Sequence, residues 1–192
     1  MKHPRQSGGG GGGNRGGGRG SFHVPLTAQE IAAMPYRKCV GLMIFNREGL
    51  VWIGRRVGSP NLGASKSGWW QMPQGGIDPG ETPLAAAKRE LFEETGMRSA
   101  EVIAESQHWY NYELPTDLIG RALGGRYRGQ TQRWFAMRFT GEESEINIDP
   151  VDHDREFDVW RWAPMGELLD AIVPFKRPVY EKIVAEFWHL GG

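Results

Sequence analysis

The feature that most constrains this chain is the stretch GGIDPGETPLAAAKRELFEETGM, which covers residues 75–97. Its three glycines and one proline before position 81 predict a tight loop. Thr82 is suited to cap a helix, Pro83 to occupy its first position, and Gly96 to end it. The sequence therefore predicts a loop followed by a helix over about 82–95.

Three carboxylates share one face of this predicted helix. Glu90, Glu93 and Glu94 stand at positions i, i+3 and i+4, so their Cβ atoms lie about 5–6 Å apart. Such like charges repel one another unless a divalent cation binds them, and Mg²⁺ or Mn²⁺ suits oxygen ligands of this kind. Taken alone, the triplet is equally typical of a solvated acidic helix face. The apolar stripe expected to seat the helix on the core consists of Leu84, Ala87 and Leu91.

The spacing of the whole stretch resembles the Nudix box, G-x5-E-x7-R-E-U-x-E-E-x-G-U, where U is a bulky aliphatic residue. Every fixed position matches, and the structural positions of the box are Gly75, Glu81, Arg89 and Gly96. We expect Glu81 to pair with Arg89 and tie the loop to the helix. The resemblance implies an α/β fold, the Nudix α/β/α sandwich with a mixed central sheet, in which Glu90, Glu93 and Glu94 bind divalent metal.

The resemblance extends from Tyr36 to Phe187. There the chain is similar to the branch that holds RNA pyrophosphohydrolases and asymmetrically cleaving diadenosine tetraphosphate hydrolases. The motifs that carry this similarity are YRKCVG at 36–41, WQMPQGG at 70–76, GGRYRGQTQRWF at 124–135, EFDVWRW at 156–162 and VPFKRPVY at 173–180.

The same resemblance implies roles for residues outside the box. Glu156 is expected as a distal carboxylate at the metal and catalytic site. The residues that match substrate contacts of the family are Arg37, Arg56, Tyr112, Phe175 and Lys176. Cations suit phosphates and aromatic faces suit bases, although each of these residues is also typical of a core or of a solvated rim. Gln130, Gln132 and Arg133 belong to the pattern without an assignable role.

The rest of the chain divides into three parts. Residues 1–20 are rich in glycine and arginine and lack a core, so we expect a disordered tail. Residues 21–35 form a transition segment with a short helix after Thr27, and the Nudix hydrolase domain spans 36–190. Within that domain we expect strands near 38–46, 50–56, 69–73, 101–112, 131–140 and 157–163, a loop over 57–68, and helices near 164–173 and 177–189.

Composition narrows the function classes. Lys and Arg number 23, as do Asp and Glu, so the net charge is zero and a globally basic, DNA-binding surface is not expected. The one cysteine, Cys39, sits among apolar strand residues and is expected to be a buried thiol. The absence of a membrane-length apolar run and of a secretory signal predicts a cytoplasmic protein.

The resemblance implies a hydrolase that removes pyrophosphate from the 5′-triphosphate end of RNA. Hydrolysis of diadenosine tetraphosphate or another dinucleoside polyphosphate is the alternative within the enzyme class. A catalytically silent Nudix module that binds nucleotides is a third reading, but such modules commonly lack box glutamates that this chain retains.

A truncation tests the expectation for the tail. Deletion of residues 1–20 should leave the melting temperature and the turnover of a small dinucleotide nearly unchanged, because no core includes them. If Arg15 and Arg19 help to hold RNA, KM for a long transcript rises modestly, mainly at low salt. A large fall in the melting temperature would contradict the expectation.

Overall fold

The structure is a computed structural model that describes residues 26–57, 68–149 and 154–191. The tail predicted over 1–20, the first part of the transition segment and nearly all of the loop predicted over 57–68 lie outside these residues. The strands are β1 Tyr36–Phe45, β2 Val51–Arg56, β3 Trp70–Gln71, β4 Gln74–Gly76, β5 Ala100–Glu105, β6 Tyr110–Glu113, β7 Gly129–Phe139 and β8 Phe157–Ala163. The helices are α1 Ala28–Ala33, α2 Pro83–Thr95, α3 Leu168–Ala171 and α4 Arg177–Phe187, with short 3-10 turns at Ala122–Gly125, Glu143–Glu145, Met165–Glu167, Pro174–Lys176 and Trp188–Leu190.

A mixed sheet forms the centre of the molecule. Its main strand order is β3-β2-β1-β7-β5, while β4 pairs with β1, β6 with β7, and β8 with β2. The long strands β1 and β7 run parallel over ten residue pairs, from Tyr36 opposite Gly129 to Phe45 opposite Arg138. The other pairings among the described strands are antiparallel.

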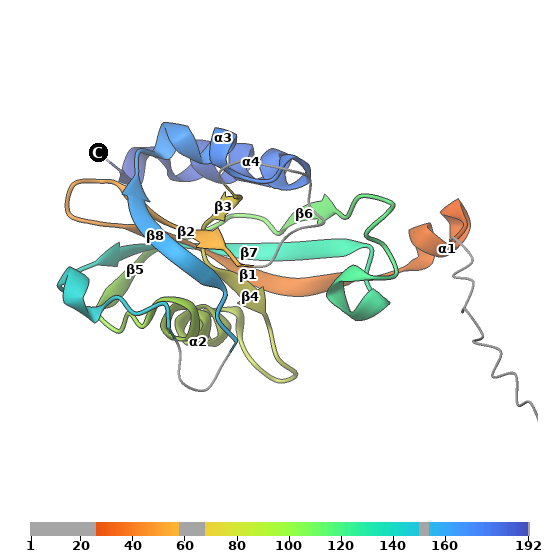
Figure 1. The fold of residues 1–192 in the computed structure, drawn as a ribbon, viewed down its shortest axis with the longest axis horizontal. Helices are drawn as coiled ribbons and strands as arrows, with labels where there is room; N and C mark the ends of the chain where they lie inside the picture. The colour runs from red at the N-terminus through yellow and green to blue at the C-terminus, as the bar shows by residue number, and fades with distance from the viewer. Residues whose placement is uncertain (1–25, 58–67, 150–153, 192) are drawn as a thin grey trace, which may run out of the picture.

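Helices cover both faces of this sheet, with α2 on one side and α3 and α4 on the other (Figure 1). Successive residues of β1 therefore face two different cores. Val40 and Leu42 pack in the cluster that contains Leu91 of α2, whereas Met43 packs in the cluster that contains Ile183 of α4. Because a strand presents alternate side chains to opposite faces, a strand buried on both faces must be almost continuously apolar. The α/β/α sandwich with a mixed sheet is thus confirmed.

Local capping signals account for the ends of α2. The Thr82 hydroxyl accepts a hydrogen bond from the Ala85 N–H at 3.2 Å, and Pro83 occupies the first turn. Gly96 ends the helix in the left-handed region, with φ of 74°, which suits glycine. The helix predicted over 82–95 is confirmed. The short helix predicted after Thr27 is also present as α1, with a capping box between Thr27 and Glu30.

Three predicted elements differ in the structure. The strand predicted over 69–73 is replaced by the two short strands β3 and β4, which lie on either side of Met72–Pro73. The strand predicted over 101–112 is divided into β5 and β6, because the Ser106 side chain bonds to Trp134 and the Gln107 N–H bonds to Glu186. The helix predicted over 164–173 contains only a 3-10 turn and four α-helical residues, since the chain becomes extended at 172–173, before Pro174.

The expected packing of several apolar residues also needs correction. Leu84 is 42% exposed, and its place in the buried side of α2 is taken by Ala86 beside Ala87 and Leu91. Of the eight tryptophans in the sequence, Trp52 and Trp134 are fully buried, whereas Trp188 is 60% exposed. Cys39 is buried in β1, as predicted.

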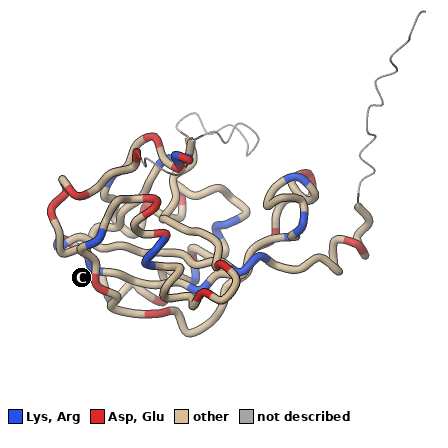
Figure 2. Tube along the Cα trace, turned by 90° about the horizontal axis from the view of Figure 1, so that it is seen from below, with Lys and Arg blue, Asp and Glu red and all other residues tan. Residues whose placement is uncertain are grey.

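Charged residues are distributed over the whole molecule. Figure 2 shows acidic and basic positions interspersed along the described trace, in keeping with the equal numbers of the two kinds. Within the described ranges, no helix is long and apolar enough to cross a membrane.

Candidate active site

Arg89 connects the loop before α2 with the acidic face of the helix. Its guanidinium donates to Glu81 at 2.9 and 3.0 Å, to the Gly76 carbonyl at 2.8 Å, to Glu90 at 2.7 Å and to Glu93 at 3.0 Å. These partners raise the pKa of the Arg89 guanidinium above its ordinary value, and the hydrogen bonds to Glu81 contribute most. The Glu81–Arg89 pair expected from the sequence is therefore present, and the same cation also restrains two of the three helix carboxylates.

Gly75, in the short strand β4 just before the loop that leads to α2, allows the backbone to pass directly against the Glu90 carboxylate. A Cβ atom at position 75 would stand 1.8 Å from the carboxyl carbon of Glu90. Any larger residue would displace either the backbone here or this carboxylate. Glycine is therefore required because the carboxylate lies so close to the backbone, and not because of its backbone angle. The Gln74 N–H beside it donates to Glu94 at 3.1 Å, which holds a second carboxylate against the same loop.

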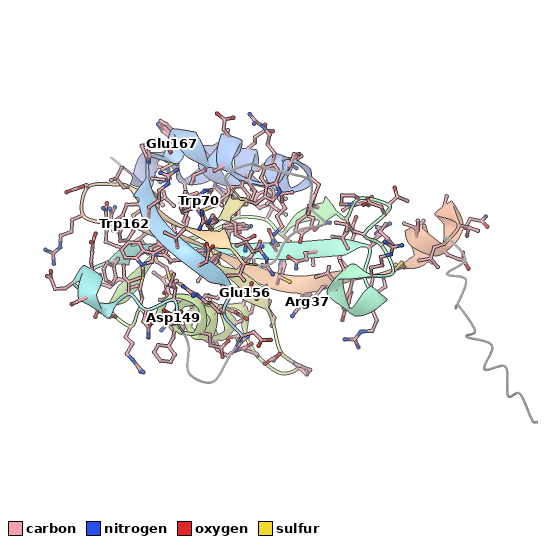
Figure 3. All side chains as sticks on the ribbon, in the orientation of Figure 1. Arg37, Trp70, Asp149, Glu156, Trp162 and Glu167 are labelled. Atoms are coloured by element: carbon pink, nitrogen blue, oxygen red, sulfur yellow. The ribbon has the colours of Figure 1, made fainter. Side chains whose placement is uncertain are left out.

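A cavity of about 790 Å³ opens beside these carboxylates. It brings together eight of the nine predicted catalytic and substrate-binding residues, namely Glu90, Glu94, Glu156, Arg37, Arg56, Tyr112, Phe175 and Lys176. Glu93 is not among the described residues that line it, and its carboxylate accepts a hydrogen bond from Arg89. Figure 3 labels Glu156 and Arg37, which come from opposite parts of the chain and reach this cavity from the start of β8 and from β1.

A β-bulge places two predicted site residues against each other. The register between β2 and β8 shifts at Arg55–Arg56, and Arg56 then pairs with Glu156 at 2.9 Å, while Arg55 pairs with Asp158 at 2.8 Å. Bulges commonly redirect side chains beside functional sites. No feature of the sequence indicated that the predicted phosphate contact Arg56 and the predicted distal carboxylate Glu156 form an ion pair.

Two carboxylates in the cavity, those of Glu94 and Glu90, are electrostatically unfavourable as anions. Burial raises the pKa of Glu94 well above that of an ordinary carboxyl, and the negative charges of Glu156 and Glu90 raise it further. Burial also raises the pKa of Glu90, although Arg89 acts in the opposite direction. These groups lie close enough to repel one another, so the region favours an added positive charge.

The buried amine of Lys176 in the same cavity favours an added negative charge. Burial and, to a smaller extent, the positive charge of Arg56 lower the pKa of Lys176 to about 7, although the negative charges of Glu94 and Glu156 act in the opposite direction. Lys176 donates to the Gln71 side-chain oxygen at 3.1 Å and lies 5.5 Å from the centre of the Tyr112 ring. Phe175 packs against that ring with centroids 5.5 Å apart. An anion beside an aromatic group, such as a nucleotide phosphate, would suit this part of the cavity.

The donor set fits a hard divalent cation. The carboxylates offer only oxygen, the type of ligand that Mg²⁺ and Mn²⁺ prefer. Over the residues that the structure describes, no three acidic, histidine or cysteine side chains already form a compact metal-binding group. Arg89, the Gln74 N–H and Arg56 bond to carboxylate oxygens instead, so binding of a cation would require some of these bonds to be exchanged.

Several lining residues were missed at the level of sequence. Gln71, Gln74 and Gln130 line the cavity; the first two belong to the WQMPQGG motif and the third to the GGRYRGQTQRWF motif, but neither motif indicated a role for its glutamines. The segment between β6 and β7 also contributes residues to the wall, including Asp117, Leu118, Arg121, Ala122 and Leu123. No motif or periodicity marked residues 117–123.

Comparison with known proteins agrees with this fold. A family model described as "NUDIX domain" matches residues 35–183. An RNA pyrophosphohydrolase of Agrobacterium fabrum is 57% identical over 169 residues, covering 83% of this chain and 95% of that protein. One from Mesorhizobium japonicum is 60% identical over 160 residues, with coverage of 82% and 92%.

A solved structure, the Escherichia coli dihydroneopterin triphosphate pyrophosphohydrolase, superimposes with a TM-score of 0.56 at 20% identity and covers 79% of this chain and 99% of that one. That likeness concerns the fold alone. The chain belongs to the Nudix hydrolase family, whose members are typically dependent on divalent metal.

Burial of Lys176 predicts that its replacement stabilises the protein. In Lys176→Met no ammonium is buried, and we expect the free energy of unfolding at pH 7 to rise by about 1–3 kcal/mol. Between pH 7 and 10.5 the Lys176 side chain carries a proton in the unfolded wild type that it has lost in the folded wild type. The free energy of unfolding of the wild type therefore rises with pH over this range. The difference in this free energy between Lys176→Met and wild type becomes smaller accordingly. Urea unfolding at pH 7 and pH 10 measures this.

The exposed Lys88 of α2 provides the matched control, since Lys88→Met should change stability little at either pH. Equal or lower stability of Lys176→Met at pH 7 would show that the buried ammonium carries no such cost.

Proposed function

We propose that this chain removes pyrophosphate from the 5′-triphosphate end of RNA and leaves a 5′-monophosphate, which would promote decay of messenger RNA. The observation that carries the proposal is the cavity in which repelling carboxylates lie beside a buried amine and an aromatic pair. The relatives that are 57% and 60% identical over more than four fifths of this chain are named RNA pyrophosphohydrolases, which supports the choice of substrate.

Glu90, Glu93, Glu94 and Glu156 are the residues that would hold Mg²⁺ or Mn²⁺. When bound, such a cation neutralises polyphosphate oxygens and lowers the pKa of a bound water. Glu94 and Glu90 already lie in the cavity wall, and Glu156 reaches it from the position just before β8. Glu93 lies one helical turn from Arg89 and would contribute after exchange of that ion pair.

Lys176, Arg37 and Arg56 would bind phosphate oxygens of the substrate. Arg37 lies over Gly76, where a Cβ atom would meet its guanidinium at 2.2 Å, so the bare glycine backbone gives this side chain its place. The Tyr112–Phe175 pair offers aromatic surface for the first base. A triphosphate bound between the carboxylates and Lys176 would satisfy both charge requirements of the cavity.

Removal of a carboxylate charge tests the catalytic assignment. We expect Glu94→Gln and Glu93→Gln to lower kcat at saturating Mg²⁺ by about 10²–10⁴, equivalent to several kcal/mol of transition-state stabilisation. Glutamine at 94 can still accept the Gln74 N–H, and one of three repelling charges is gone, so metal-free stability should not fall.

Glu101→Gln is the control, because Glu101 is exposed on β5, outside the cavity lining. If either box variant turned over at nearly the wild-type rate, the assignment of that glutamate as a metal ligand would be wrong.

A parallel assay tests the substrate. We expect triphosphorylated RNA to be converted to the monophosphorylated form, with weaker or parallel cleavage of diadenosine tetraphosphate under one Mg²⁺ and salt condition. Lys176→Ala should lower kcat/KM for both, because a phosphate contact does not depend on the chain that carries the phosphate. Efficient cleavage of the dinucleotide with no change in the RNA end would favour the dinucleoside polyphosphate hydrolase instead.

A further inference from the structure

Three buried glutamines connect the core of the molecule to Lys176. Gln132 Nε2 donates to Gln74 Oε1 at 2.8 Å, and Gln74 Nε2 donates to Gln71 Oε1 at 3.3 Å. Lys176 Nζ donates to the same Gln71 oxygen at 3.1 Å. All three glutamines are at most 8% exposed. We call Gln132, Gln74 and Gln71 the amide chain. It runs from β7 through the short strands β4 and β3 to the cavity wall.

Trp134 sets the direction of this chain. Its indole N–H donates to Gln132 Oε1 at 3.1 Å, and an indole nitrogen can only donate. Gln132 must therefore turn its oxygen to Trp134 and its amide nitrogen to Gln74 and Gln130, the second at 2.9 Å. Each following amide then has one compatible orientation. The Lys176 ammonium at the far end is also a pure donor. The donors at the two ends therefore require the same orientation of each amide between them.

The position of Trp134 is itself fixed by packing. The ring is fully buried and lies against Gly41, where a Cβ atom would stand 2.5 Å from it. It packs edge-to-face on Tyr180, with centroids 5.6 Å apart. The Tyr180 hydroxyl accepts the Met72 N–H at 3.0 Å, so the same aromatic pair also holds the backbone between Gln71 and Gln74.

The orientation of Gln71 is unfavourable for Gln71 alone. Its Nε2 is buried and has no hydrogen-bond partner within the described part of the chain. A reversed amide would instead direct its donors at two other donors, those of Gln74 and Lys176. The oxygen is therefore directed at Lys176 by the neighbours of Gln71. Because an amide oxygen is neutral, the bond holds the ammonium in place without cancelling its charge.

We propose that the amide chain, oriented by Trp134, positions the Lys176 ammonium for a phosphate of the substrate. Trp134 and Gln132 are thus positioning residues, since neither lines the cavity within the described residues and both act through Gln71. The inference rests on the proposed function, because it concerns the phosphate contact made by Lys176.

A double-mutant cycle on kcat/KM tests the proposal. Trp134→Phe removes the indole donor and keeps an aromatic ring. We expect it to lower kcat/KM for triphosphorylated RNA about 3- to 10-fold in the wild-type background. In the Lys176→Met background the same change should have little further effect, because the ammonium that the chain positions is gone. The loss should divide between KM and kcat in the proportion that Lys176→Met shows.

Trp52→Phe is the matched control. Trp52 is also fully buried in the sheet, but it packs in the α2-side cluster, and its indole nitrogen has no hydrogen-bond partner among the described residues. This variant loses the same volume without cutting the amide chain, and its kcat/KM should stay within about twofold of wild type. If Trp134→Phe does not fold, Gln132→Met takes its place, because methionine fills similar space and neither donates nor accepts strongly.

Equal losses of kcat/KM in Trp134→Phe and Trp52→Phe would overturn the proposal. So would a loss of kcat/KM on adding Trp134→Phe to Lys176→Met that is as large as the loss in the wild-type background. A wild-type protein that leaves triphosphorylated RNA unchanged would instead refute the proposed function. The double-mutant cycle can then be measured with diadenosine tetraphosphate as the substrate. Non-additive effects of Trp134→Phe and Lys176→Met on kcat/KM would still support the positioning role of the amide chain, and additive effects would still refute it.

Discussion

The guanidinium of Arg89 bonds to Glu81, Glu90, Glu93 and the Gly76 carbonyl, and the geometry of the acidic site depends on that one group. A loop and a helix joined only at Thr82 could take many relative positions. The five bonds from Arg89 select one of them, in which Gly75 lies directly against the Glu90 carboxylate. The loop follows β4, which contains Gly75 and pairs with the central strand β1. The carboxylates are thereby fixed relative to the sheet and to the cavity.

Opposite electrostatic requirements meet in that cavity. The pKa of Glu94 is raised by burial and by the negative charges of Glu156 and Glu90, whereas the pKa of Lys176 is lowered by burial and by Arg56. Neither shift favours the folded protein by itself. A cation with an attached polyphosphate supplies positive charge to the carboxylates and negative charge to the amine. The free protein therefore carries an electrostatic cost that its proposed ligands would relieve.

Features governed by local chemistry could be predicted from the sequence. The caps at Thr82 and Gly96 bounded α2, and spacing along that helix placed Glu90 and Glu94 together. Features governed by distant contacts could not. The break between β5 and β6 depends on bonds from Ser106 and Gln107 to β7 and α4, and the bulge that pairs Arg56 with Glu156 depends on strand register. The amide chain likewise needs residues from three strands, so its glutamines could be noted in the sequence but given no role.

Manganese titration followed by amide NMR tests the central claim, that the carboxylates around the Gly75 loop form a divalent cation site. Paramagnetic Mn²⁺ broadens the signals of nuclei near the bound ion. The Gln74 and Gly75 amides lie against Glu94 and Glu90, so their signals should broaden first in the wild type. In Glu94→Gln, much more Mn²⁺ should be needed to broaden these two signals. In the wild type, an excess of Mg²⁺ should restore them by displacing Mn²⁺. Early broadening elsewhere, with the signals of Gln74 and Gly75 unchanged, would contradict the account.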